Sequence, residues 1–341
     1  MKSAMLIGNG VNRLNPEESY SWGALLSELN STSDFAVDLD NSLKPFPLAF
    51  DEVLHVNNIE SELNEKLKEL KKKIREAIEQ QLEKKKGYNE YHRKLVDLGY
   101  DNILTTNYDY AFQLSADENF FDKKTDWAVN KQEIKHSLKR CYAIPEINTK
   151  VWHIHGELYD SRELSEKSNH YNEESIMIGY AHYVSYLNKI IENIKGKSGN
   201  QKVHNQSLMV RLKNEVNSPF WTDILFTHNV DILGQGLDFS ENHLWWLINY
   251  RANSMRQKET KYGVKINNSI KFYYPDIKNS AKKETSQKNY LRKNIDALKL
   301  KAVSELLKAF CVESIPIKCE GYEDFYDKFI DLQSYAERSI G

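Results

Sequence analysis

The sequence predicts an α/β fold in which a mostly parallel sheet carries helices on both faces and a helical insertion lobe. Short apolar runs rich in β-formers alternate along the chain with longer stretches of helical periodicity. This alternation is typical of parallel strands joined by helices. Polar, glycine-containing segments directly follow several of the apolar runs, at the position where an open parallel sheet places its ligand crevice.

Seven apolar runs are expected to form the strands, and helices are expected between most of them. The runs lie at residues 5–7, 102–105, 150–154, 175–179, 230–234, 270–274 and 314–318. Pro316 has no amide donor, so the last run is expected at an edge of the sheet. Two C-terminal helices are expected, from about Lys288 to Phe310 and from Glu323 onward.

The most regular helical pattern lies between the first two predicted strands, over residues 59–86. One apolar stripe runs along it, made of Leu63, Leu67, Leu70, Ile74, Ile78 and Leu82. We expect this helix to pack on the body by its stripe, with a coiled-coil contact to another chain as the alternative. The chain is interpreted as one domain over residues 1–341, with a helical insertion at 45–100 and a second insertion at 185–220.

Composition narrows the class of protein. The 341 residues carry a formal net charge of -2, so bulk charge recruits neither nucleic acid nor an acidic membrane. No apolar run is long enough for a signal peptide or a membrane span, which predicts a cytoplasmic protein. Cys141, Cys311 and Cys319 are widely spaced, which argues against a disulfide framework and against a four-thiolate zinc site.

The segment Gly8-Asn9-Gly10 follows the first predicted strand, and Arg13 comes soon after it. Glycines let backbone amides approach a phosphate closely, so this turn is a candidate phosphate-binding loop. Only two of the three glycines of a dinucleotide fingerprint are present, and an ordinary tight turn explains the same residues.

Polar residues Thr105, Thr106, Asn107 and Asp109 cluster at the end of the second predicted strand. Asn107 can donate and accept hydrogen bonds, which suits a ribose diol or an ordered water, and Asp109 can fix a neighbouring donor. The simpler interpretation is that Asn107 and Asp109 cap the helix that begins near Tyr110.

His153 and His155 alternate at the end of the third run, so on a strand they would point to one face. They could be a pair of metal ligands, or one of them could be a general base. Backbone carbonyls that satisfy two buried histidines are the structural alternative.

A second glycine turn, Gly234-Gln235-Gly236-Leu237-Asp238, follows the fifth run and precedes a helix that contains Trp245. It supplies the other side of a two-sided crevice. Asp238 could bond a ribose hydroxyl or cap that helix.

In their order along the chain, these four segments resemble the motifs of the SIR2 superfamily, the sirtuin-like NAD-consuming domains. In that family a glycine turn, a T-x-N-x-D segment, an H-G segment and a G-x-S-L segment line one NAD pocket. The matching residues are Gly8, Gly10 and Arg13; Thr105, Asn107 and Asp109; His155 and Gly156; and Gly234 to Leu237, with Gly236 in place of the serine. The resemblance implies a Rossmann-like sheet.

The pattern lacks the paired cysteines of the sirtuin zinc module, so no zinc module is expected and protein deacylation is disfavoured. It looks like the bacterial SIR2-like proteins that hydrolyse NAD+ in antiphage defence, with some similarity to AbiH-type abortive infection proteins. The resemblance implies an NAD+ hydrolase with NAD+ as its substrate and no metal. Because an unrestrained NAD+ hydrolase in the cytoplasm would be toxic, we also expect control by homo-oligomerisation or by a partner such as a co-encoded ATPase or a phage component.

The resemblance also implies roles for individual residues. Asn107 would contact the ribose or the attacking water, His155 would be the general base and Asp109 would position its neighbours. The remaining candidates would contact the rest of NAD+: Gly8, Asn9, Gly10, Arg13, Thr105, Thr106, Gly234, Gly236 and Asp238. Two alternatives remain, a catalytically silent NAD- or ADP-ribose-binding module and a metal-dependent hydrolase that uses His153 and His155.

Overall fold

The computed structural model describes most of the chain. It covers residues 2–14, 44–56, 88–127, 136–157, 176–197, 205–257, 262–277 and 287–338, with isolated positions between them. Apart from positions 72 and 76, the long helix expected over residues 59–86 lies outside the described residues. Two helices at the borders of the expected 45–100 insertion are described, α2 (Phe46–Val56) and α4 (Glu90–Val96).

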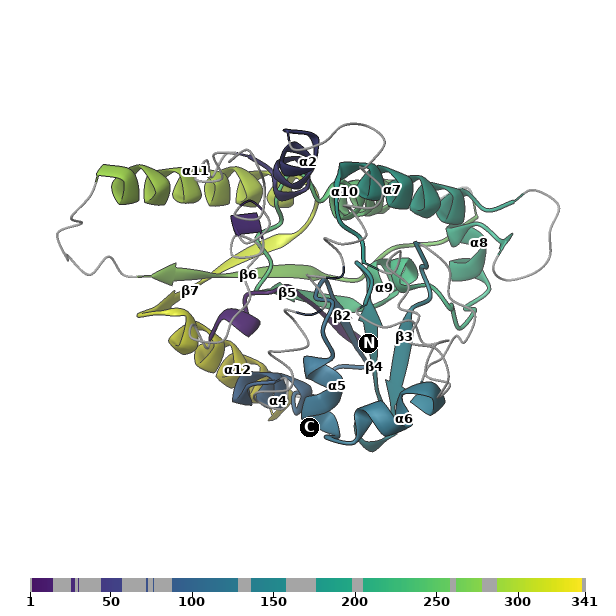
Figure 1. Cartoon of the computed structure of the whole chain (residues 1–341). Helices are drawn as coiled ribbons and strands as arrows, with labels where there is room; N and C mark the ends of the chain where they lie inside the picture. Colours follow the sequence, from purple (N-terminus) through teal and green to yellow (C-terminus); the bar gives the residue numbers. More distant parts are fainter. Residues whose placement is uncertain are drawn as a thin grey trace.

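Seven strands form one sheet in the order β3-β4-β2-β1-β5-β6-β7 (Figure 1). All neighbouring pairs are parallel except β3 and β4, which are antiparallel. The strands are β1 (Ser3–Ile7), β2 (Asn102–Thr105), β3 (Cys141–Ile144), β4 (Thr149–His153), β5 (Asn229–Leu233), β6 (Ile270–Ile277) and β7 (Glu313–Cys319).

Helices cover both faces of the sheet, as Figure 1 shows. One face carries α4, α5 (Ala111–Ala116), α6 (Phe120–Trp127) and α12 (Tyr322–Arg338). The other face carries α7 (Tyr180–Lys195), α8 (Leu208–Lys213), α9 (Trp221–Thr227), α10 (Asn242–Arg256) and α11 (Gln287–Ala309). Short 3-10 helices lie at η1 (Asn12–Leu14) and η3 (Pro145–Ile147).

The apolar residues of β1 show how the sheet separates two cores. Met5 and Ile7 join the core on the α4, α5 and α12 face, whereas Ala4 and Leu6 join the core on the α7 and α10 face. All four are at most 1% exposed, because side chains alternate along a strand that is covered on both sides. The predicted helical layers on both faces are therefore confirmed.

The four motif segments all begin at one row of the sheet. Ile7 of β1 is in register with Thr105 of β2 and with Leu233 of β5, and Thr105 is in register with His153 of β4. β1 and β5 are neighbours in the sheet. The next strand after β1, β2, lies on the side of β1 away from β5, and the next strand after β5, β6, lies on the side of β5 away from β1. This reversal of strand order marks the place where open α/β sheets hold ligands.

The structure confirms six of the seven predicted strands and corrects one. Residues 176–179 form no strand; they are a loop that leads into α7, with Gly179 as the N-cap residue of that helix. The antiparallel strand β3 was not predicted. Pro316 lies in β7, the last strand of the sheet, so its predicted edge position is confirmed.

The second expected insertion begins inside a helix of the main body. Tyr186, Ile190 and Ile194 of α7 are buried in the core on the α10 face, although polar residues separate them in the sequence. No helix in the described ranges has the length and apolar character needed to cross a membrane.

Candidate functional site

The two glycine turns, after β1 and after β5, are packed directly against each other. The Gly8 amide donates to the Leu233 carbonyl at 3.3 Å, and the Gly10 amide donates to the Gly234 carbonyl at 2.9 Å. A Cβ at Gly10 would lie 2.8 Å from the Gly234 Cα, so the contact requires glycine. These two amides are engaged inside the protein, which makes the turns a structural junction between β1 and β5.

Arg13 and Gly236, which lie in the two turns, are exposed. The Arg13 side chain is exposed on η1, and a Cβ at Gly236 would meet no described residue within 4 Å. Both candidates are therefore accessible to a ligand, unlike the Gly8 and Gly10 amides.

The end of β2 places three polar side chains in the interior. Thr105, Thr106 and Asn107 are each at most 5% exposed. The Thr105 hydroxyl accepts a hydrogen bond from the Asn107 amide at 3.1 Å, and the Thr106 hydroxyl donates to the Gln235 side chain at 3.3 Å. Within the described part of the chain, the Asn107 side-chain NH2 group has one long contact, 3.5 Å, to the Gly8 carbonyl. Asn107 is thus held by its backbone and presents its carboxamide beside the β1 turn.

Asp109 belongs to a different, fully bonded group on the α4 and α5 side. Its carboxylate accepts from the Asn12 side chain at 2.7 Å and from the Ala111 amide at 3.0 Å. The Asn12 side-chain oxygen in turn contacts His92 Nε2 at 2.8 Å. Tyr110 is the N-cap residue of α5, so Asp109 lies one residue before the cap position and supports the start of the helix through its bond to the Ala111 amide.

Burial shapes the protonation of this group. Desolvation raises the pKa of Asp109, although the hydrogen bonds from Ala111 and Asn12 oppose it. Desolvation also lowers the pKa of His92 to about 3, so this histidine is neutral at neutral pH. The neutral His92 ring and the Asn12 carboxamide then hold the Asp109 carboxyl group in place.

His153 and His155 do not share a face, so the expectation that they point together is wrong. β4 ends at His153, and the chain turns at Ile154 and His155, which breaks the strand alternation. The His153 ring contacts the Gln113 side chain at 2.7 Å and the Asn107 carbonyl at 3.3 Å, on the α5 side. The two rings therefore lie in different surroundings, which argues against the alternative of a metal pair made of His153 and His155.

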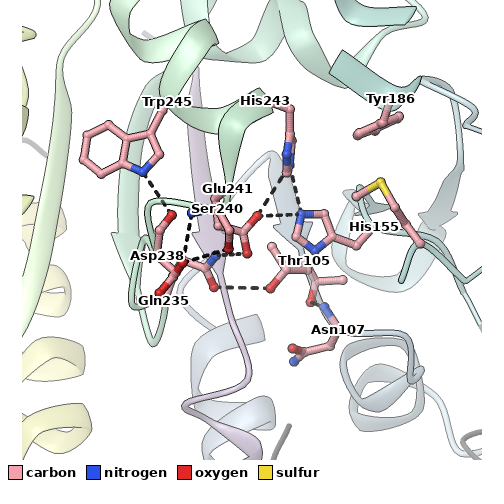
Figure 2. Close-up of polar contacts among 12 residues, drawn as sticks. Thr105, Asn107, His155, Tyr186, Gln235, Asp238, Ser240, Glu241, His243 and Trp245 are labelled. Atoms are coloured by element: carbon pink, nitrogen blue, oxygen red, sulfur yellow. Dashed lines mark hydrogen bonds and ion pairs between the residues drawn. The ribbon is translucent and has the colours of Figure 1, made fainter. Parts of the chain in front are cut away.

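His155 instead meets two residues that the sequence interpretation did not include, Glu241 and His243 (Figure 2). The His155 and His243 Nε2 atoms are 2.9 Å apart, and the Glu241 Oε2 atom lies 3.3 Å from His155 Nε2 and 3.8 Å from His243 Nε2. His155 and His243 are at most 2% exposed. Figure 2 shows the His155 ring between this pair and the side chains of Thr105 and Asn107.

The cluster is electrostatically unusual. Burial, together with the neighbouring His155, lowers the pKa of His243 well below its ordinary value. Among the residues that the structure describes, Glu241 Oε2 and His243 Nδ1 are buried without a hydrogen-bond partner. Buried polar atoms without a hydrogen-bond partner lower the stability of a folded protein, so they are rare in protein interiors.

The loop between β5 and α10 brings Glu241 to His155. Asp238 accepts hydrogen bonds from the Ser240 amide at 2.9 Å and the Ser240 hydroxyl at 2.7 Å, and its carbonyl accepts from the Trp245 indole at 3.0 Å. Asp238 therefore closes the turn before α10 and does not cap the helix with its side chain, since α10 begins after Glu241. Gln235 adds a long contact, 3.5 Å, to the other Glu241 oxygen.

The structure thus brings Asn107 and His155 to the ends of paired strands, beside the glycine junction, and moves Asp109 and His153 to the opposite side. A carboxylate and an imidazole two residues apart after a glycine turn, at Glu241 and His243, were the signal that sequence reasoning missed. No protein-family model matches this chain, and no curated protein matches it in sequence.

Proposed function

We propose that this protein cleaves the glycosidic bond of NAD+ and releases nicotinamide and ADP-ribose. One observation carries the proposal: the side chains of Asn107 and His155 are buried at the ends of paired strands, next to the reversal of strand order. A carboxamide and an imidazole in that position can hold a ribose and activate a water. The four motif segments that begin at one row of the sheet support the same proposal.

The chemistry requires little from the leaving group. Nicotinamide departs from NAD+ as a neutral molecule because its ring nitrogen is cationic in the substrate. The electrons of the C1′–N bond leave with it, and positive charge develops on the ribose. The protein must orient that ribose and deliver a water whose proton goes to a base.

We assign the base role to His155 and the ribose or water contact to Asn107. When His155 accepts the proton of the attacking water, the Glu241 carboxylate at 3.3 Å stabilises the imidazolium that forms. The water oxygen then forms the new bond to C1′, so the products are ADP-ribose, nicotinamide and one proton.

The phosphate-binding part of the proposal rests on Arg13. The Gly8 and Gly10 amides already donate to carbonyls of the β5 turn, so they are not free to bind a pyrophosphate. The exposed Arg13 guanidinium, next to the same turn, can form charge-assisted hydrogen bonds with it. Activity of this kind would deplete NAD+, which agrees with a role in antiphage defence and with control by self-association.

The test is to incubate the full chain with NAD+ and to measure nicotinamide and ADP-ribose by chromatography. We expect release by the native chain and loss of release in His155→Ala and Asn107→Ala. The matched control is His55→Asn, which removes an exposed imidazole at the end of α2 and is expected to keep full activity.

Binding measurements separate the alternatives. NAD+ binding by calorimetry without any nicotinamide release, in the native chain at the concentrations where it self-associates, would favour a silent binding module. Equal turnover in the native chain and in both variants would contradict the assignment of Asn107 and His155.

A further inference from the structure

We propose that His155, Glu241 and His243 form a binding site for a divalent transition-metal ion, with zinc as the best fit. Each of the three side chains offers one potential ligand atom, and these atoms all lie within 4.8 Å of one another. This inference is independent of NAD+ cleavage, because it rests on the contacts among these three side chains.

The separations of the three atoms match a metal coordination shell. A tetrahedral ion with bonds of about 2.0 to 2.1 Å places its ligand atoms about 3.3 Å from one another. The separations here are 2.9 Å between the two Nε2 atoms, 3.3 Å from His155 to Glu241 and 3.8 Å from His243 to Glu241. The values therefore bracket the tetrahedral edge.

Hydrogen bonding alone leaves this cluster incomplete. One proton shared between the two Nε2 atoms links the two rings, but Glu241 Oε2 and His243 Nδ1 are both buried without a hydrogen-bond partner among the described residues. The 3.3 Å approach of His155 to that oxygen lacks hydrogen-bond geometry. A cation among the three atoms would bind all of them at once and would offset the cost of burying the carboxylate.

The ligand set indicates the class of metal. Two neutral imidazoles and one carboxylate favour zinc and its neighbours over magnesium and calcium, which prefer oxygen ligands. Three protein ligands leave a fourth position for a water or a substrate atom, as in catalytic zinc sites.

Rigid elements hold the three ligands. His155 follows β4, Glu241 precedes α10, and His243 lies in the first turn of α10. The rings of Tyr183 and Tyr186 from α7 pack against His243, with centroids 5.7 Å and 5.4 Å away. The cluster is therefore assembled by the packing of α7 and α10 on the sheet, before any ion binds.

A bound metal would have a definite effect on the reaction proposed above. A metal on Nε2 of His155 occupies that nitrogen and leaves Nδ1 protonated, so neither ring nitrogen can accept a proton from water. Metal occupancy and base catalysis by His155 therefore exclude each other. Zinc is expected to inhibit nicotinamide release, and a chelator is expected to restore it.

The test uses the metal-free full chain without NAD+. Titration with Co²⁺ should produce the visible absorption of a tetrahedral site at one ion per chain, and Zn²⁺ should displace it. Glu241→Gln and His243→Gln should each weaken Zn²⁺ binding, measured by calorimetry, at least about tenfold. His55→Asn is the matched control and should bind Zn²⁺ as the native chain does.

Folding is checked separately, since His243 is fully buried. Glu241→Gln keeps the shape of the side chain, and its circular dichroism spectrum and melting temperature without metal should match those of the native chain. Zn²⁺ should raise the melting temperature of the native chain and of His55→Asn but not that of Glu241→Gln.

The outcomes are separable from those of the NAD+ experiment. Absence of stoichiometric Co²⁺ and Zn²⁺ binding, or unchanged affinity in folded Glu241→Gln, overturns the metal site even if NAD+ is cleaved. Stoichiometric metal binding by a chain that releases no nicotinamide, metal-free or loaded, supports the site and contradicts the proposed function alone.

Discussion

Two polar clusters lie at the ends of neighbouring strands, and they differ in how completely they are bonded. In the first, the Asn12 side chain is hydrogen-bonded to both Asp109 and His92, and the Asp109 carboxylate also accepts a hydrogen bond from the Ala111 amide. In the second, His155 contacts Glu241 and His243, and two buried atoms have no hydrogen-bond partner within the described ranges. A saturated network fixes the architecture, whereas an unsaturated one can still bind something.

This difference in hydrogen bonding separates the roles of residues that look alike in the sequence. Asp109 and His155 both follow a strand within a few residues, and the sequence predicts both as site residues. Their surroundings place Asp109 in the saturated group and His155 in the unsaturated group. We therefore expect substitutions at the first cluster to change stability and substitutions at the second to change binding or activity.

The largest expected effect separates His155 from His92. His155→Ala should lower nicotinamide release about 100-fold to 10,000-fold, because general-base catalysis contributes that much. His92→Ala should keep the reaction per folded molecule while lowering the free energy of unfolding, since Asn12 and Asn89 lose a buried partner. Steady-state kinetics and urea unfolding of both variants measure the contrast.

The glycine junction should respond to a methyl group only where backbone contacts are close. Gly10→Ala places a Cβ 2.8 Å from the Gly234 Cα and should destabilise the protein by about 1 to 3 kcal/mol. Gly236→Ala has nothing within 4 Å and should change stability by less than about 1 kcal/mol. Thermal unfolding of both variants compares them, and an equal loss would contradict the close packing of the two turns.

Acid should destabilise the protein through the buried histidines. Burial lowers the pKa of His92 from its ordinary value of 6.5 to about 3 in the folded chain, so the unfolded chain binds the proton first as the pH falls. The contribution of His92 is complete above pH 6.5 and should decline below it by about 1.4 kcal/mol per pH unit.

Urea unfolding at pH 7.0 and pH 5.0 tests this, with His92→Gln as the comparison. The variant should lose less stability than the native chain between these two pH values. His228, whose pKa burial lowers to about 4, should keep part of the dependence in the variant. An identical slope in both proteins would mean that His92 is protonated in the folded chain.

The smallest expected effect concerns the turn before α10. Asp238→Ala removes the acceptor of two hydrogen bonds from Ser240 and should cost about 0.5 to 1.5 kcal/mol. The same change should also weaken Zn²⁺ binding a few-fold, because the turn holds Glu241. Calorimetry on Asp238→Ala and Asp238→Asn tests this, and the Asn variant should retain most of the affinity.

The sequence predicted most of the sheet, because buried parallel strands are short continuous apolar runs bounded by turns. It missed β3, where Cys141–Ile144 is an edge strand defined by its antiparallel pairing with β4. It assigned residues 175–179 to a strand because Ile176, Met177 and Ile178 are apolar, yet these residues are buried as a loop that leads into α7.

The candidate site was predictable only in part. Asn107 and His155 stood out as polar residues at strand ends, and the structure buries both. The contact between His155 and His243 spans 88 residues and depends on how α10 lies on the sheet, which local patterns do not contain. The separation of His153 from His155 depends on where β4 ends, and strand ends are the least certain feature of a sequence-based assignment.

The shared row through Ile7, Thr105, His153 and Leu233 has a consequence for how this protein can vary. Adjacent parallel strands are about 4.8 Å apart, so the spacing of the segments that follow the row is set by the sheet itself. This spacing does not depend on the length of the chain that connects those strands. Connecting segments away from this edge can therefore lengthen, shorten or be exchanged for binding modules while the spacing of Asn107 and His155 stays constant.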